Sequence, residues 1–221
     1  MTRLFHTTVQ TGPVEFEVSE VHCTKVSLGS LDNNSYLLHA GGNSPLLLID
    51  AATEPRRLLG MMAGRPLGVV VSTHRHADHL QALAEVIAQT GAKPFAGRAD
   101  AEAIAQQTGV ASHQVWTGDQ IGCGGVSLEV IGLVGHTPGS IALVLRGTGT
   151  GPTHIFSGDS LFPGGVGKTD SPADFASLLD DVTGKIFDRF CDQTIIHPGH
   201  GDSTTLGAER PQLAQWRARG W

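Results

Sequence analysis

One short run of residues constrains the fold of this chain more than any other feature: HRHADH at positions 74–79. The run follows LGVVVSTH (67–74), an apolar stretch typical of a buried strand. In a chain of this composition the pattern H-x-H-x-D-H is expected by chance only about 0.002 times. A loop at the carboxyl end of a strand can direct alternate residues of the run at one ion and its last two ligands at a second. The sequence therefore predicts a metal site at a sheet edge.

The same side chains could instead be solvated loop residues, with Asp78 capping a helix that begins at His79. Capping does not explain three histidines, because a histidine cluster without metal contributes nothing to the fold and repels itself when protonated. We therefore expect a metal site, with capping as an added role for Asp78.

The periodicity of apolar residues predicts two groups of strands, each accompanied by helices. The predicted strands cover 14–18, 21–28, 35–40, 45–50, 67–74, 126–132, 141–146, 154–158 and 194–197. The predicted helices cover 54–63, 80–89, 98–107 and 171–187, the last with Ser171 as its N-cap. We expect an α/β (layered α+β) fold in which two sheets pack face to face with helices outside. No low-complexity linker interrupts the chain, which predicts one domain over 1–221.

Charge and cysteine content exclude several classes of protein. The net charge is −6 with no basic block, which argues against nucleic acid as the main partner. The three cysteines, Cys23, Cys123 and Cys191, form no CxxC pair, so neither a disulfide framework nor a thiolate zinc site is expected.

Export and membrane insertion are not expected either. The first ten residues, MTRLFHTTVQ, lack the apolar region of a signal peptide, and no apolar run is long enough to span a bilayer. The sequence predicts a cytoplasmic protein without a membrane partner.

Three later segments place a further ligand-type residue beside glycine, at or just after a predicted strand end. They are GHTPG (135–139), SGDS (157–160) and PGHG (198–201). Together with the HRHADH run, and with Asp50 in LLLIDAA, they resemble the pattern of the metallo-β-lactamase superfamily over roughly residues 34–210. The resemblance implies an αββα sandwich with a two-metal site at the upper edge of the sheets.

The resemblance also implies a role for each ligand residue. His74, His76 and His136 would hold the first metal, Asp78, His79 and His200 the second, and Asp159 would bridge the two. Asp78 and Asp159 are the residues expected to be catalytic, whereas Asp50 is expected to orient a ligand histidine. Imidazole and carboxylate ligands suit two divalent ions, zinc above all, and also iron or manganese.

Within the superfamily, THRHADH, GHTPGS, GDSLFPGGVGKTD and HPGHGDSTTLGAER are similar to hydroxyacylglutathione hydrolase (glyoxalase II) and its short bacterial forms. That resemblance implies a small-molecule substrate, a thioester attacked by a hydroxide that bridges the metals. The segment 161–170 would form a flexible flap beside the metals. Lys168 falls where that family keeps a basic residue for a substrate carboxylate; an exposed loop lysine is the alternative.

Other activities share the same motifs and stay open. A persulfide dioxygenase would use a single iron held by His74, His136 and Asp159. A lactonase belongs to the same hydrolytic class, and an RNA-processing nuclease is disfavoured by the acidic balance. The sequence leaves the oligomeric state open.

Four residues that are not predicted metal ligands have two interpretations each. His197 could support a metal ligand or be an ordinary strand-end histidine. Tyr36 could reach a substrate, although its place in an alternating strand favours packing. Trp216 and Trp221 are expected to anchor a terminal helix or to form an oligomer contact.

Overall fold

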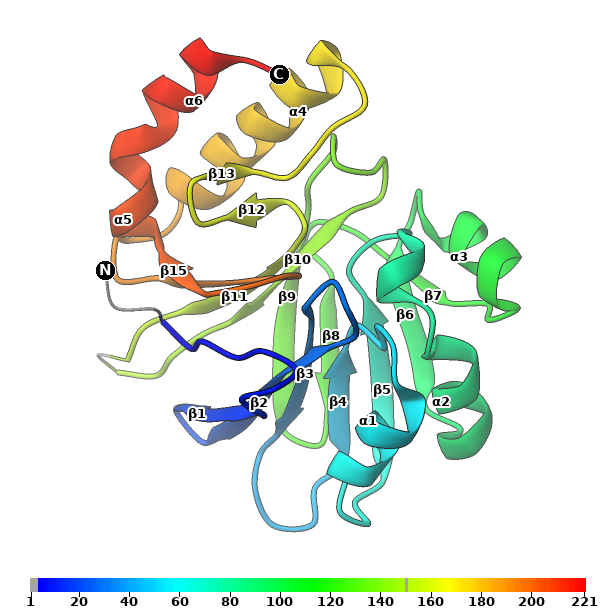
Figure 1. Cartoon of the computed structure of the whole chain (residues 1–221). Helices are drawn as coiled ribbons and strands as arrows, with labels where there is room; N and C mark the ends of the chain where they lie inside the picture. The colour runs from blue at the N-terminus through cyan, green and yellow to red at the C-terminus, as the bar shows by residue number, and fades with distance from the viewer. Residues whose placement is uncertain (1–3, 150) are drawn as a thin grey trace.

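Two large β-sheets lie face to face in the computed structural model, which describes residues 4–149 and 151–221 (Figure 1). Helices cover the outer face of each sheet. Each sheet combines parallel and antiparallel strand pairs. The predicted αββα sandwich of two mixed sheets is therefore confirmed. Among the described residues, no helix is long and apolar enough to cross a bilayer.

Within the described residues, the first sheet has seven strands in the order β1-β2-β3-β4-β5-β6-β7. It is antiparallel from β1 to β4 and parallel from β4 to β7. Its strands are β1 (Val14–Val18), β2 (Val21–Leu28), β3 (Asn33–His39), β4 (Leu46–Ile49), β5 (Leu67–Ser72), β6 (Lys93–Gly97) and β7 (His113–Val115).

The second sheet has six strands in the described part of the chain, in the order β15-β14-β11-β10-β9-β8. Its strands are β8 (Gln120–Cys123), β9 (Val126–Gly132), β10 (Ile141–Leu145), β11 (His154–Gly158), β14 (Ile195–Pro198) and β15 (Thr204–Thr205). Only β11 and β14 are a parallel pair among these described strands.

The helices divide between the two outer faces (Figure 1). The first sheet is covered by α1 (Pro55–Met61), α2 (Leu83–Thr90) and α3 (Ala101–Thr108), and the second by α4 (Pro172–Val182), α5 (Leu206–Glu209) and α6 (Leu213–Arg219). Short 3-10 turns occur at Ala77–His79 and Arg210–Gln212, and a π-helical turn at Thr183–Phe187 continues α4.

Buried apolar side chains form a layer between the sheets and a layer under each group of helices. Leu38, Leu128 and Phe156 belong to the layer between the sheets. Strands β4 and β5 are apolar almost throughout because both of their faces are covered. The sheets are thereby held rigidly enough to position the loops that leave their ends.

The parallel pairs bring the motif loops to one edge of the sandwich. Parallel strands end at the same side of a sheet, so the segments that follow β4 and β5 are neighbours, as are those that follow β11 and β14. Asp50 and the HRHADH run leave the first sheet at this edge, and Asp159 and His200 leave the second.

One local expectation was wrong, and another segment has more regular structure than its sequence indicated. Asp78 does not cap a helix: it lies inside the 3-10 turn, whose N-cap position is His76 and has no side-chain capping bond. Its carboxylate is directed at His200 instead, 3.3 Å from that ring. The segment 161–170, predicted as a flap, contains regular structure. Its first part folds as an antiparallel hairpin of β12 (Leu161–Phe162) and β13 (Gly165–Val166).

The predicted cap of α4 is present, and it generates a test. Ser171 Oγ accepts a hydrogen bond of 3.1 Å from the main-chain N–H of Asp174. Replacement by alanine leaves this N–H without its partner, so Ser171→Ala should lower the free energy of unfolding by about 1 kcal/mol. Calorimetry should show a fall in Tm of about 2–4 °C. Ser30→Ala, at an exposed turn, is the control, and equal Tm values for all three proteins would contradict the capping role.

Candidate metal centre

Ligand-type side chains from both sheets converge at the common edge. In the described part of the chain they form three overlapping groups whose ligand atoms all lie within 4.8 Å of one another. The groups are His74, His76 and His136 (the first ligand set), Asp78, His79 and His200 (the second ligand set), and His74, His79 and Asp159. The structure thus brings together every residue that the sequence placed at the metal site.

Asp159 lies between the two sets. Its Oδ1 is 3.5 Å from His79 Nε2, and its Oδ2 is 3.4 Å from His200 Nε2. The same Oδ2 is 3.8 Å from His136 Nε2, on the other side. One carboxylate therefore faces ligands of both sets, as a residue shared by two ions must.

Four of the histidines are anchored through Nδ1, which leaves Nε2 directed into the cluster. His79 Nδ1 donates to Asp50 Oδ2 at 3.0 Å, and His74 Nδ1 donates to Thr73 Oγ1 at 3.0 Å. Bonds of this kind select the tautomer whose free nitrogen can bind a metal.

The other two anchors are main-chain carbonyls. His136 Nδ1 donates to the carbonyl oxygen of Lys168 at 2.7 Å, and His200 Nδ1 to that of Leu31 at 2.9 Å. The rings are therefore oriented by the protein before any ion binds.

Asp50 forms a hydrogen bond with His79, one of the predicted ligand histidines. Its buried carboxylate accepts from His79 and also from the main-chain N–H and the hydroxyl of Thr73, at 2.7 and 2.8 Å. Its φ of 54° is in the left-handed region, which aspartate tolerates better than most residues.

Sequence reasoning missed a second buried carboxylate, Asp100. It accepts hydrogen bonds of 3.0 Å from the main-chain N–H groups of Arg75 and Gly139, and another from the hydroxyl of Thr137. It therefore ties the HRHADH run to the segment that carries His136. The sequence offered one clue, since Asp100 follows a strand and precedes a helix, much as Asp50 does.

Buried charges set the protonation of the cluster. Burial and the neighbouring His79 lower the pKa of His74 well below its usual range. Burial lowers the pKa of His200 too, but the hydrogen bond to Asp159 and the charge of that carboxylate outweigh it and raise this pKa to about 9. For Asp159, burial raises the pKa, yet the hydrogen bond to His200 and the charges of nearby histidines bring it below its usual range. Protons and a cation would thus compete for the same atoms.

Buried ligand atoms without a hydrogen-bond partner indicate that the residues of this cluster fit a metal centre. Among the described residues, His74 Nε2, His136 Nε2 and Asp159 Oδ1 are buried and make no hydrogen bond. An unpaired buried polar atom is costly, so three of them aimed into one space fit a site that holds an ion. Imidazole nitrogen and carboxylate oxygen together are donors for divalent ions such as zinc, iron or manganese.

The remaining predicted residues lie around this centre. Lys168 has an exposed side chain, and its main chain contacts His136. Tyr36 is buried in the core and donates to the carbonyl of Pro198, so packing was the correct interpretation. His197 contacts His154 and Ser203, at 2.8 and 2.9 Å, and is a buried histidine below the centre.

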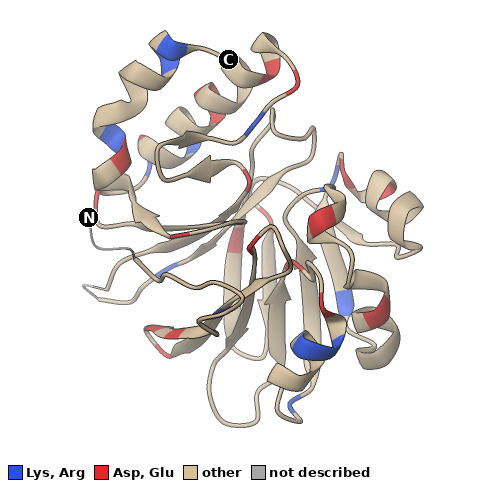
Figure 2. Ribbon diagram, viewed as in Figure 1, with Lys and Arg blue, Asp and Glu red and all other residues tan. Residues whose placement is uncertain are grey.

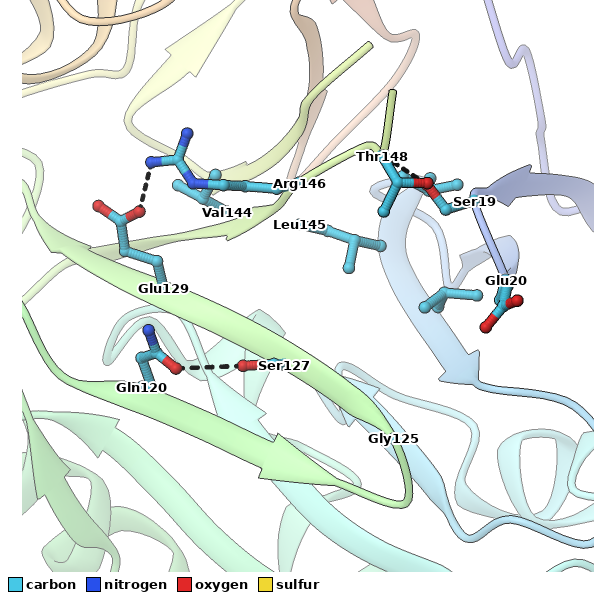
Figure 3. Close-up of a pocket in the computed structure, with 12 residues that line it drawn as sticks. Ser19, Glu20, Gln120, Gly125, Ser127, Glu129, Val144, Leu145, Arg146 and Thr148 are labelled. Atoms are coloured by element: carbon cyan, nitrogen blue, oxygen red, sulfur yellow. Dashed lines mark hydrogen bonds and ion pairs between the residues drawn. The ribbon is translucent and has the colours of Figure 1, made fainter. Parts of the chain in front are cut away.

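A groove of about 520 Å³ lies elsewhere, between the β1–β2 turn and strands β8 to β10 (Figure 3). Its polar groups pair with one another, as Glu129 does with Arg146 at 2.6 Å and Gln120 with Ser127 at 3.3 Å. None of the described residues that line it belongs to the ligand sets. The metal centre, with its unpaired ligand atoms, is therefore a better candidate for the active site than this groove.

Comparison with known proteins agrees with this geometry. The sequence matches the Metallo-beta-lactamase superfamily over residues 28–200, which include both ligand sets. The chain belongs to this superfamily.

Individual relatives extend the comparison. An uncharacterized protein of Mycobacterium tuberculosis is 30% identical over 207 residues, covering 82% of this chain and 92% of its own length. A hydroxyacylglutathione hydrolase of Fuscovulum blasticum is 32% identical over 172 residues, covering 76% of this chain and 62% of the hydrolase. The crystal structure of TTHA1623 in a di-iron-bound form has 30% identity and a TM-score of 0.63, covering 84% of this chain and 96% of that protein.

Because the centre is closely packed, Gly199 should not tolerate a larger side chain. A Cβ added there would lie 2.1 Å from Asp159 Oδ1 and 2.7 Å from His79 Cε1. Gly199→Ala should therefore displace the Asp159 carboxylate and weaken zinc binding by about tenfold or more, as measured by equilibrium dialysis. Gly60→Ala is the matched control, because a Cβ at Gly60 meets nothing within 4 Å. Wild-type zinc affinity in Gly199→Ala would contradict the placement of Asp159.

Proposed function

We propose that this protein is a metal-dependent hydrolase that cleaves a thioester of a small thiol with two divalent ions. The observation that carries the proposal is the arrangement of two ligand sets around one shared carboxylate, Asp159. His74, His76 and His136 would hold one ion, and Asp78, His79 and His200 the other.

The relatives support both parts of this proposal. The di-iron-bound form of TTHA1623 shows that a relative at 30% identity holds two metal ions. The relative from Fuscovulum blasticum is named a hydroxyacylglutathione hydrolase, and hydroxyacylglutathione is a thioester. A thioester substrate is therefore the first class to test.

The residues of the centre would position the metal ions and the substrate carbonyl. Two bound divalent ions would lower the pKa of a coordinated water to about 7 and stabilise negative charge on the substrate oxygen. Asp159 and Asp78, which lie 3.4 and 3.3 Å from His200 Nε2, would fix the geometry of the ligands around the substrate carbonyl.

Among the described residues, the histidines and carboxylates grouped at the centre would all bind metal, which suits a thioester. A thiol has a pKa of about 8.5, so a thiolate leaves without being protonated first. An amide would need a proton donor beside the leaving nitrogen, and the ligand sets use their histidines and carboxylates for metal. The residues of the ligand sets therefore favour substrates with a good leaving group.

The substrate would reach the centre beside the segment that carries Lys168. Gly167 lies against the main chain of Asp159, where an added Cβ would be 1.7 Å from its carbonyl oxygen, and Lys168 follows directly. The main chain of Lys168 is thus anchored close to the centre, and its exposed side chain would attract a substrate carboxylate from there.

We propose a small molecule as substrate rather than a nucleic acid. Figure 2 shows lysine and arginine spread over several helices and loops, and the net charge of the chain is −6. A phosphate backbone is bound through clustered positive charge, which this distribution does not favour.

The reaction class can be tested without oxygen. Protein purified without added metal and then loaded with zinc should hold about two ions per chain. It should hydrolyse S-acyl thiols in oxygen-free buffer, at a rate that rises with pH through a pKa of about 7 as the coordinated water ionises. A chelator should abolish the activity, and added Zn²⁺ should restore it.

The panel should contain lactoylglutathione and thioesters of smaller thiols. The contradicting outcome is inactivity on every thioester, together with oxygen consumption by a single-iron form given glutathione persulfide. The dioxygenase interpretation would then replace the hydrolase.

The role of Lys168 has its own test. A charge remote from the reacting bond binds ground state and transition state alike, so Lys168→Ala should raise KM for a carboxylate-bearing thioester more than it lowers kcat. A loss of about 1–2 kcal/mol, roughly five- to thirtyfold in kcat/KM, is expected. Lys93→Ala, on β6, serves as the charge-matched control. An unchanged KM would make Lys168 an ordinary surface lysine.

A further inference from the structure

The hairpin of β2 and β3 reaches from the first sheet to the second ligand set. Its residues 31–34 contact Asp78, His200 and the segment around His200 by hydrogen bonds. Asn33 and His200 also form an antiparallel β-bridge outside the regular strands.

Asn33 acts on Asp78 itself. Its side-chain amide donates to Asp78 Oδ2 at 2.9 Å, and this is the oxygen that faces His200 Nε2 at 3.3 Å and His79 Nε2 at 3.7 Å. Asn33 is buried, whereas Asp78 lies on a three-residue turn and its side chain is 26% exposed. Among the described residues, Asn33 is the one hydrogen-bond donor to this carboxylate from outside the ligand sets.

The same hairpin holds the carbonyl groups on either side of His200. The Asn34 amide donates to the carbonyls of Pro198 and Gly201, both at 2.9 Å, and its main-chain N–H donates to that of Gly199 at 2.7 Å. The buried ammonium of Lys25 donates to Gly201 as well, at 2.6 Å.

The first ligand set depends on other segments. Its His74 is anchored by Thr73, after β5, and its His136 by the main chain of Lys168. Within the described residues, no hydrogen bond joins the hairpin to the side chains of this set. The two sets share Asp50 and Asp159, but the hydrogen bonds of the hairpin reach the side chains of the second set alone among the described residues.

We propose that Asn33 is a positioning residue that sets the affinity of the second ligand set, by fixing the carboxylate of Asp78 against His79 and His200. This inference rests on the proposed two-metal function. A hydrogen-bond partner behind a metal ligand typically contributes 10- to 100-fold in affinity, because it removes the cost of orienting that ligand when the ion binds. Because the Asn33 amide occupies only one lone pair of the Asp78 carboxylate, the other lone pairs remain directed toward His79 and His200.

The experiment measures two zinc dissociation constants by competition with a chromophoric chelator, for wild type and for Asn33→Ala. One constant, that of the second ligand set, should rise by about 10- to 100-fold in the variant, and the other should stay unchanged. Excess zinc should restore the turnover of Asn33→Ala, because its ligands are all still present. Gln107→Ala is the matched control: its amide also donates to the HRHADH segment, to the carbonyl of Arg75 at 3.0 Å, away from the second set.

Each outcome decides the inference. Wild-type constants in Asn33→Ala overturn it, and so does an equal rise in both constants, which would indicate a general loss of structure. Should Asn33→Ala fail to fold, Asn33→Ser keeps a small polar side chain that is too short to reach Asp78, and the same comparison applies. A wild-type protein that binds one zinc would overturn the proposed two-metal function and this inference with it, whereas two zinc ions with an unchanged Asn33 variant would overturn the inference alone.

Discussion

The buried carboxylate of Asp50 is the interaction on which the rest of the centre depends. It sits at the end of β4 and accepts hydrogen bonds from Thr73 and His79, which follow the neighbouring parallel strand β5. Thr73 in turn accepts from His74, so one buried charge orients a ring of each ligand set. A buried carboxylate without such partners would cost several kcal/mol, and the three hydrogen bonds offset that cost while fixing the loop between the strands.

Rigid sheets and short anchoring bonds together explain why the cluster can hold like-charged groups close together. The second sheet contributes Asp159 and His200, and these meet the histidines of the first sheet across the edge of the sandwich. His79 Nε2 and His200 Nε2 are only 3.1 Å apart, a separation that two protonated rings would oppose. Their Nδ1 anchors, on Asp50 and Leu31, hold them there, so the fold itself sustains an arrangement that a cation then stabilises.

The end of the chain supports the segment expected to meet the substrate. Glu209 accepts from the main-chain N–H of Gly164 in the β12–β13 hairpin, and the indole of Trp221 donates to the carbonyl of Thr169, both at 2.9 Å. Trp221 thus joins the terminal segment to the segment 161–170, the predicted flap. Lys168 lies one residue before Thr169, so its position depends on contacts more than forty residues away in the sequence.

The sequence by itself determined two sheets with helices outside, through apolar periodicity, and indicated a metal site at a sheet edge, through HRHADH. The αββα class and the complete set of candidate ligands followed from the resemblance of HRHADH and the three later motifs to the metallo-β-lactamase superfamily. The resemblance also indicated that Asp50 orients a histidine. Only the tertiary structure decided which partners hold these ligands. Asp100 binds Arg75 and Gly139, and Asn33 binds Asp78, across 25 to 45 positions that local periodicity cannot relate. Asp78 was misjudged as a helix cap for the same reason, since the ring that its carboxylate faces, His200, is brought there by the second sheet.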